Sequence, residues 1–313
     1  MELIKGLALL CVFTLFIAFR SEAVETLRLN QIQIKGTHNS YHIKPRIAFD
    51  KSHKYSHLPL YEQLDERGIR AFELDVHKSG KGVLEVYHIA VIDNRSTCDR
   101  FSSCLQELKR WSDDYPGHSP VFVWIEIKDS TGGKKINDFS EVDRVIKEVL
   151  AERLITPGDL QGNFPTLQTA IQEKGWPTIA EASGKFMFIL DSDKRAYEHY
   201  LRADSLQGRV MFYRAKPEDI DKPWAVVTKT GPGDFHSQAL EKNFIVAQNL
   251  CSAKLSEKEC LDKLETSRAA GTHLLMDDFE GGSPAQSHGS YFVKLLSSDT
   301  VDCNPVVAEN YCP

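Results

Sequence analysis

Residues 69–77 read IRAFELDVH, and the pattern of this stretch decides the fold. Successive side chains of a strand point to opposite faces, so every second residue shares a face. One face carries two carboxylates and an imidazole, and the other is mostly apolar. Unpaired carboxylates are costly to bury, so the polar face requires a cation or carboxyl groups that keep their protons. The polar face holds Ile69, Ala71, Glu73, Asp75 and His77, and the other face holds Arg70, Phe72, Leu74 and Val76.

Similar apolar, β-branched or aromatic runs recur along the chain and predict eight strands. Segments with helical periodicity lie between most of them. About eight alternations of strand and helix predict an α/β fold with a parallel sheet, and eight strands close a TIM-type (β/α)8 barrel. Irregular connections between the first three strands indicate a distorted barrel, and an open doubly wound sheet is the alternative. The predicted strands are residues 32–36, 69–77, 83–89, 120–128, 185–191, 209–215, 244–250 and 273–279.

The N-terminus has the pattern of a secretory signal. Lys5 precedes an apolar run at residues 6–19, and small residues follow at Ser21 and Ala23. The run is shorter than the roughly 20 residues that a membrane-spanning helix needs. We therefore expect residues 1–23 to be a signal peptide, residues 24–313 to form one catalytic barrel domain, and the protein to be secreted without a transmembrane segment.

Charge and cysteine usage agree with that compartment. The net charge of −6 gives no general attraction to nucleic acid. Asn94 begins the sequon Asn-Arg-Ser and is a candidate glycosylation site. The cysteines outside the signal fall into three close pairs, which local clustering in a secreted chain favours as disulfides. The pairs are Cys98 with Cys104, Cys251 with Cys260, and Cys303 with Cys312.

A third carboxylate is expected beside the first two. In residues 120–128, PVFVWIEIK, the period of two places Trp124, Glu126 and Lys128 on the face opposite an apolar one. Residues at the carboxyl ends of barrel strands face the active-site mouth. Glu73, Asp75, Glu126 and the side-chain carbonyl of Asn39 are hard oxygen ligands, which favour Ca²⁺, with Mg²⁺ less favoured. Ordinary ion pairs of Glu73 and Glu126 with lysine or arginine are the alternative.

Three histidines accompany these carboxylates. His38 and His88 each follow a strand, in GTHNS and VYHI, and His77 ends another. Two imidazoles beside a cation favour phosphodiester cleavage, because one can accept a proton from the attacking hydroxyl while the other protonates the leaving oxygen. We interpret most of the other histidines, residues 42, 53, 57, 118, 199, 236, 273 and 288, as surface or loop residues.

The stretches GTHNSYH, RAFELDVH, LEVYHIAVIDN and CLQELKRWSDDYPGHSPVFVWIEIKD resemble the phosphatidylinositol-specific phospholipase C superfamily, especially its secreted calcium-dependent branch. The resemblance is strongest over residues 30–130. It implies a TIM-like barrel that cleaves the bond between glycerol and phosphate in phosphoinositides, with a phospholipid at a membrane surface as substrate. In that chemistry the inositol 2-hydroxyl attacks phosphorus, and diacylglycerol and a cyclic inositol phosphate are the products.

The resemblance also implies roles for individual residues. His38 matches the first catalytic histidine, and His88 is favoured over His77 for the second, which stays open. Lys128 is a candidate to bind a substrate phosphate, and an ion pair with Glu126 is the alternative. Asp278 is a candidate to orient His38, with Asp277 equally suited by spacing. The calcium ligands implied are Asn39, Glu73, Asp75 and Glu126.

Some features depart from the intracellular relatives. No flanking lipid-binding or membrane-targeting domain is recognisable, so we expect loops of the barrel to make any membrane contact. The phosphate-binding basic residues of those relatives have no clear match, which argues against a preference for highly phosphorylated inositides. Two alternatives remain: a metal-dependent glycerophosphodiesterase or sphingomyelinase-D-like lipase, and a secreted lipid-binding protein without activity.

Overall fold

Eight parallel strands form a ring in the computed structural model, which describes residues 25–129, 133–191, 194–201, 203–298 and 300–308. The predicted signal peptide, residues 1–23, lies outside the described residues. Each strand of the ring pairs in parallel with the next, and an isolated parallel bridge between residues 215 and 228 joins β7 to β8. The ring consists of β1 (Ile32–Thr37), β2 (Ala71–Lys78), β4 (Val121–Ile127), β6 (Phe186–Leu190), β7 (Phe212–Tyr213), β8 (Val227–Lys229), β9 (Ile245–Asn249) and β10 (Leu274–Asp277).

Two pairs of neighbouring strands in the ring share very few paired residues, which agrees with the expected distortion of the barrel. β1 and β2 share a single paired position, Gly36 with Ala71, and β7 meets β8 only at the bridge. A Cβ atom at Gly36 would lie 2.9 Å from the carbonyl oxygen of Ala71 and 2.4 Å from the sulfur of Met276. Glycine therefore permits the close approach of β1 to both neighbouring strands.

The strand count of eight was correct, but its membership was wrong in two places. Residues 83–89 contain β3 (Leu84–Val86), which pairs antiparallel with β2 as a hairpin and does not belong to the ring. The eighth barrel strand is β8 (Val227–Lys229), which the sequence interpretation missed. Two further short strands lie outside the ring, β5 (Leu154–Ile155) and β11 (Asp302–Cys303).

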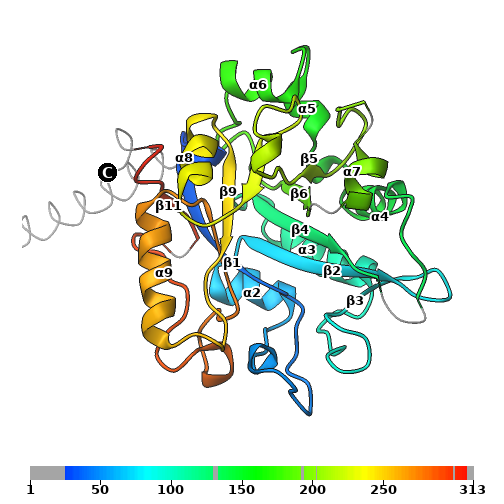
Figure 1. The fold of residues 1–313 in the computed structure, drawn as a ribbon, viewed down its shortest axis with the longest axis vertical. Helices are drawn as coiled ribbons and strands as arrows, with labels where there is room; N and C mark the ends of the chain where they lie inside the picture. The colour runs from blue at the N-terminus through cyan, green and yellow to red at the C-terminus, as the bar shows by residue number, and fades with distance from the viewer. Residues whose placement is uncertain (1–24, 130–132, 192–193, 202, 299, 309–313) are drawn as a thin grey trace, which may run out of the picture.

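Helices surround the ring, with α8 and α9 on one side and α4 and α7 on the opposite side in Figure 1. Their apolar faces and the strands enclose one large buried core. No helix in the described part of the chain is long and apolar enough to cross a membrane. The helices are α2 (Leu60–Arg67), α3 (Phe101–Asp114), α4 (Ser140–Leu150), α5 (Pro157–Gln161), α6 (Leu167–Glu173), α7 (Lys194–Tyr200), α8 (Asp234–Glu241) and α9 (Glu257–Ala269).

Two of the expected disulfides are formed. One joins Cys98 to Cys104 at the start of α3, and the other joins Cys251 to Cys260 on α9. Cys312, the expected partner of Cys303, lies outside the described residues. Asn94 is exposed, as a glycosylation site requires. Both disulfides close loops beside the carboxyl ends of the strands, where the candidate site lies.

Candidate active site

Three carboxylates meet at the carboxyl ends of two neighbouring strands. Glu73 and Asp75 come from β2 and Glu126 comes from β4, and one oxygen of each lies within 4.8 Å of the others. β2 and β4 pair in register, with Asp75 opposite Glu126, which brings the two side chains to the same level of the barrel. The strand periodicity of the sequence predicted this grouping.

Asp75 is the member of this cluster that most needs a cation. Its side chain is fully buried, and neither carboxylate oxygen accepts a hydrogen bond from the described residues. Burial raises the pKa of Asp75 to about 7; the positive charge of Lys128 opposes this rise, and the negative charge of Glu126 reinforces it. A buried oxygen pair without donors, beside two more carboxylates, fits a hard divalent cation such as Ca²⁺.

Two lysines contact the three carboxylates. The Nζ atom of Lys128 lies 2.6 Å from Glu126 and 3.6 Å from Asp75. Lys229, at the end of β8, donates a hydrogen bond of 3.1 Å to Glu73. Burial alone would raise the pKa of Glu73, but the charges of Lys229 and His38 outweigh burial and lower it. Lys128 and Glu126 thus form the ordinary ion pair that was the alternative to a metal site.

Asn39 follows β1 in a left-handed conformation with φ of 45°. The carbonyl oxygen of its side chain accepts a hydrogen bond of 3.1 Å from the hydroxyl of Tyr41, and its amide nitrogen donates to Tyr55 at 3.2 Å. These two bonds fix the amide orientation of a buried side chain. A carbonyl oxygen has two lone pairs, so the one bond from Tyr41 leaves a site for a cation.

His38 is held by a carboxylate that follows β10, the strand next to β1. Its Nδ1 atom lies 2.7 Å from Oδ1 of Asp278, directly after β10. Burial lowers the pKa of His38, but the carboxylates of Glu73 and Asp278 outweigh burial and raise it to about 9. Asp277, the other candidate partner, accepts hydrogen bonds from the Tyr291 hydroxyl and the Phe279 amide instead.

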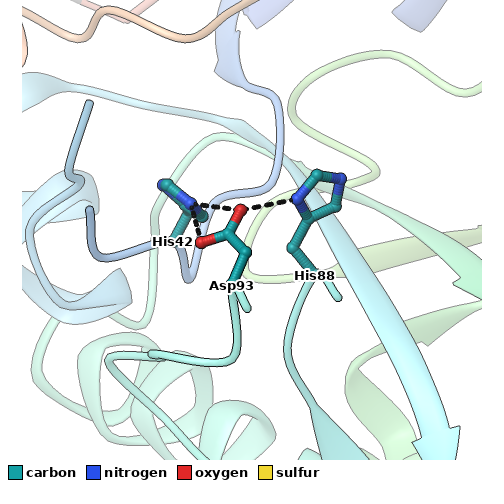
Figure 2. A group of neighbouring side chains, drawn as sticks. All are labelled: His42, His88 and Asp93. Atoms are coloured by element: carbon teal, nitrogen blue, oxygen red, sulfur yellow. Dashed lines mark hydrogen bonds and ion pairs between the residues drawn. The ribbon is translucent and has the colours of Figure 1, made fainter. Parts of the chain in front are cut away.

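His88 has a matching carboxylate partner, Asp93. Figure 2 shows Asp93 between His88 and His42, with the second ring nitrogen of His88 directed away from the carboxylate. The Nδ1 atom of His88 lies 2.8 Å from Oδ2 of Asp93, and Nε2 of His42 lies 2.8 Å from Oδ1. Asp93 is fully buried, and although burial opposes ionisation, the hydrogen bonds from His42 and His88 hold its pKa well below the usual range.

His77 lies in a different setting. Its ring stacks on Tyr87 with centroids 3.8 Å apart, and its Nε2 atom contacts the Tyr87 carbonyl at 2.8 Å. The residue is 2% exposed, and burial lowers the pKa of His77 to about 4. By contrast, His38 and His88 line one cavity of about 410 Å³, and His77 does not line it. The two candidates for the second catalytic imidazole, His77 and His88, therefore lie in different environments.

A larger cavity of about 590 Å³ contains charged residues that the sequence interpretation missed. Asp191, Arg214 and Lys229 line it and follow or end β6, β7 and β8. Arg214 pairs with Asp191, and Lys229 lies 3.8 Å from Asp191. The strand-end rule that identified His38 would have found Lys229 if β8 had been recognised.

Three of the histidines interpreted as surface or loop residues do lie in a loop, but they are not at the surface. His42, His53 and His57 lie in the loop between β1 and α2, yet all three are buried beside the site. His57 contacts the carbonyl oxygen of His38 at 3.0 Å through Nε2. The loop sequence is polar, so the burial of these three histidines could not be inferred from periodicity.

Comparison with solved structures identifies proteins of the same fold. A Ca²⁺-dependent phosphatidylinositol-specific phospholipase C from Streptomyces antibioticus has 21% identity, a TM-score of 0.61, and coverage of 81% of this chain and 95% of that chain. A calcium-dependent phosphoinositol-specific phospholipase C from a Pseudomonas species has 19% identity, a TM-score of 0.61, and coverage of 82% and 91%. A double mutant of the phosphatidylinositol-specific phospholipase C of S. aureus has 14% identity, a TM-score of 0.52, and coverage of 92% and 93%.

Sequence comparison gives the family. No curated protein matches the chain significantly. The profile of the Ca²⁺-dependent phosphoinositide phospholipase C family matches residues 27–84 and 78–305, which is most of the chain. The chain therefore belongs to the Ca²⁺-dependent phosphoinositide phospholipase C family and is a phosphodiesterase of the phospholipase C class.

Proposed function

We propose that this protein is a secreted, calcium-dependent phospholipase C that cleaves phosphatidylinositol to diacylglycerol and a cyclic inositol phosphate. One observation carries the proposal: two imidazoles, each held through Nδ1 by a buried aspartate, line one cavity. The three-carboxylate cluster lies at the same mouth, because Glu73 and His38 line the adjoining cavity. The two disulfides within the described residues favour an oxidising, extracellular compartment.

In the proposed reaction, His38 and His88 transfer protons through their Nε2 atoms, one as general acid and the other as general base. Asp278 and Asp93 accept hydrogen bonds from the Nδ1 atoms, which fixes each tautomer and leaves Nε2 for the substrate. One imidazole accepts the proton of the inositol 2-hydroxyl as its oxygen bonds to phosphorus. The other imidazole protonates the glycerol oxygen as the bond between phosphorus and that oxygen breaks.

Glu73, Asp75 and Glu126 are the residues that would hold calcium, with Asn39 as a further oxygen ligand. Bound there, the ion would neutralise charge on the phosphoryl oxygens and lower the pKa of the attacking hydroxyl. Lys229 would complement it, since its ammonium group lies beside Glu73 and faces the larger cavity. Lys128 is the second cation that can approach a phosphate, from its position beside Glu126.

The first test is the product of the reaction. Purified protein and phosphatidylinositol with calcium are expected to yield diacylglycerol and cyclic inositol phosphate, measured by phosphorus NMR and lipid chromatography. A calcium chelator abolishes turnover, and excess calcium restores it. An alcohol released with phosphate kept on the lipid would indicate the phosphodiesterase or sphingomyelinase-D-like alternative. Turnover that persists in chelator or in His38→Ala contradicts the mechanism, and absence of turnover favours the lipid-binding alternative.

Two neighbouring loops are suited to contact the lipid surface. These two loops, residues 43–57 and 87–97, are joined by a hydrogen bond of 3.3 Å between the residue 43 amide and the residue 95 carbonyl. Both contribute to the catalytic cavity, through Tyr55 and His88. Exposed apolar side chains grouped beside a cavity are typical of a lipid or protein contact. The group includes Ile47 (68% exposed), Phe49 (73%), Val91 (86%) and Ile92 (42%).

Replacing both Phe49 and Val91 with serine is therefore expected to weaken binding to phosphatidylinositol vesicles about tenfold or more. Each apolar side chain that is fully buried in the lipid contributes ~1.5–3 kcal/mol to binding. Sedimentation with vesicles measures this effect. Hydrolysis of a water-soluble inositol phosphodiester should stay unchanged. Leu261→Ser is the matched control, since Leu261 is also exposed but lies on α9. Equal vesicle binding by the double variant and the control contradicts the role of these two loops in lipid contact.

A further inference from the structure

Asp93 is surrounded by three imidazoles and not only by the one that it holds for catalysis. His42 and His88 each contact it at 2.8 Å, and Nδ1 of His53 lies 3.6 Å from its Oδ2 atom. Asp93 and His42 are almost completely buried, and His53 is 8% exposed. The four side chains come from the two loops that follow β1 and β3, so the cluster is separate from the carboxylates of β2 and β4.

The nitrogen atoms of this cluster have a place for a cation. Nδ1 of His42 faces the carbonyl oxygen of Tyr55 at 3.1 Å, which requires a proton on Nδ1. A ring with its only proton there directs the lone pair of Nε2 at the Asp93 carboxylate, so a second proton or a metal ion must lie between them. A histidine that ligates a metal usually donates its other ring N–H to a carbonyl or carboxylate in this way.

His53 provides an independent indication. Its Nδ1 atom is buried and has no hydrogen-bond partner among the described residues, although it is directed at Asp93. Buried polar atoms without partners are uncommon and require an explanation. A proton shared between His42 and Asp93 leaves this nitrogen unsatisfied, whereas a metal ion beside Asp93 would give it a partner once the His53 side chain turns toward the ion.

We propose that His42, His88 and Asp93 form an inhibitory Zn²⁺ site, and that the His53 side chain turns toward the ion as a fourth ligand when zinc binds. One ligand atom of each of His42, His88 and Asp93 lies within 4.8 Å of the others, whereas Nδ1 of His53 lies 3.6 Å from Asp93 and outside that group. Ligand atoms of a tetrahedral zinc site with bonds of ~2.0–2.1 Å lie roughly 3.3 Å apart, so His53 has to move closer to complete the site. Three imidazoles and one carboxylate suit zinc, whereas the all-oxygen cluster of Glu73, Asp75 and Glu126 suits calcium.

Inhibition follows from the position of His88. A zinc ion on Nδ1 replaces the proton that Nδ1 donates to Asp93 and occupies the lone pair of that nitrogen. The one remaining ring proton is then on Nε2, which has no lone pair to accept a proton from the substrate, so the second imidazole can no longer exchange a proton in the reaction. This consequence rests on the proposed function, whereas zinc binding itself does not.

Calorimetric titration of the calcium-saturated protein with zinc chloride tests the site without any substrate. We expect one zinc ion per chain with micromolar or tighter affinity, and no heat from magnesium chloride at the same concentration. His53→Gln removes one ligand and is expected to weaken zinc binding at least tenfold. His199→Gln, which replaces an exposed histidine, should bind zinc as the wild type does. Thermal unfolding checks that both variants are folded.

Activity on phosphatidylinositol gives the second readout. Zinc should inhibit the wild type and His199→Gln at the concentration that saturates the site, and His53→Gln should need at least ten times more zinc for half-inhibition, measured relative to its own activity without zinc. Absence of stoichiometric zinc binding, or equal affinity in wild type and His53→Gln, overturns the site. Inhibition that excess calcium relieves places zinc at the carboxylates and also overturns it. Zinc binding that depends on His53 in a protein without phospholipase activity contradicts the proposed function alone.

Discussion

Replacing His88 with alanine is expected to lower kcat on phosphatidylinositol roughly 10²- to 10⁴-fold, the range that a positioned acid or base contributes. The imidazole is 23% exposed, is held through Nδ1 by Asp93, and shares a cavity with His38. Its Nε2 atom can therefore reach a substrate that His38 also reaches. Vesicle binding should be unchanged, because the substitution removes a proton-transfer group and no apolar contact.

His77→Phe is the matched control for this prediction. Phenylalanine keeps the stacking of the ring on Tyr87, and the wild-type imidazole, with a pKa of about 4, carries no charge near pH 7. We expect kcat within a few-fold of wild type and a small loss of stability from the missing contact to the Tyr87 carbonyl. Steady-state kinetics on both variants decide between the two histidines. A large loss of kcat in His77→Phe with little loss in His88→Ala would reverse the assignment.

Asp93→Asn keeps His88 in the protein but changes the group that orients its ring, so it tests the orienting role of Asp93. The asparagine amide retains the shape of the side chain but not the charge that Nδ1 of His88 contacts. Nitrogen NMR of labelled histidine would then show a changed tautomer for His88, in a protein that still folds. Asp93 escaped the sequence interpretation because it lies in a loop, where no periodicity relates a residue to the strand ends.

The fold was predictable because β1, β2, β4, β6, β9 and β10 are long enough to show their pattern. β8 (Val227–Lys229) escaped the sequence interpretation, although the two-residue β7 was found within the longer apolar run at residues 209–215. β3 was extended and apolar in sequence, yet a turn at residues 79–83 makes it a hairpin with β2. Local pattern shows that a segment is extended; it does not show which neighbour the segment pairs with.

The site divides in the same way. Glu73, Asp75 and Glu126 were brought together by arguments from side-chain period and strand ends, which depend only on local structure. The contact between His38 and Asp278 joins β1 to β10 across most of the chain, and spacing alone left Asp277 as an equal candidate. Closure of the barrel places these two strands side by side, which is why the structure distinguishes the two aspartates.

Asp75→Asn is expected to abolish calcium-dependent turnover, because it removes the buried carboxylate that lacks hydrogen-bond donors. An amide has one neutral oxygen where the carboxylate has two charged ones, so calcium affinity should fall by orders of magnitude. Calorimetric titration with calcium and turnover at saturating calcium measure the two effects. Asp143→Asn is the matched control: Asp143 is also buried and burial raises its pKa, but it lies on α4 and bonds to Tyr200.

The same substitution should stabilise the calcium-free protein at high pH. The pKa of Asp75 in the folded state is raised to about 7, so the folded protein keeps a proton that the unfolded chain releases near its ordinary pKa of about 3.9. The contribution of Asp75 to stability is therefore present at low pH and is lost as pH rises through this window, reaching its lowest value above pH 7. Asparagine does not titrate, and its variant escapes that loss.

Thermal unfolding at pH 5 and pH 8, with and without calcium, measures this trade between stability and metal binding. Without calcium, Asp75→Asn should unfold at a higher temperature than wild type at pH 8, and the difference should shrink at pH 5. Calcium at 100 times its Kd should stabilise wild type by about 2.7 kcal/mol and leave Asp75→Asn unchanged. A variant that calcium still stabilises, or one less stable than wild type at pH 8 without calcium, would show that Asp75 serves the fold and not the metal.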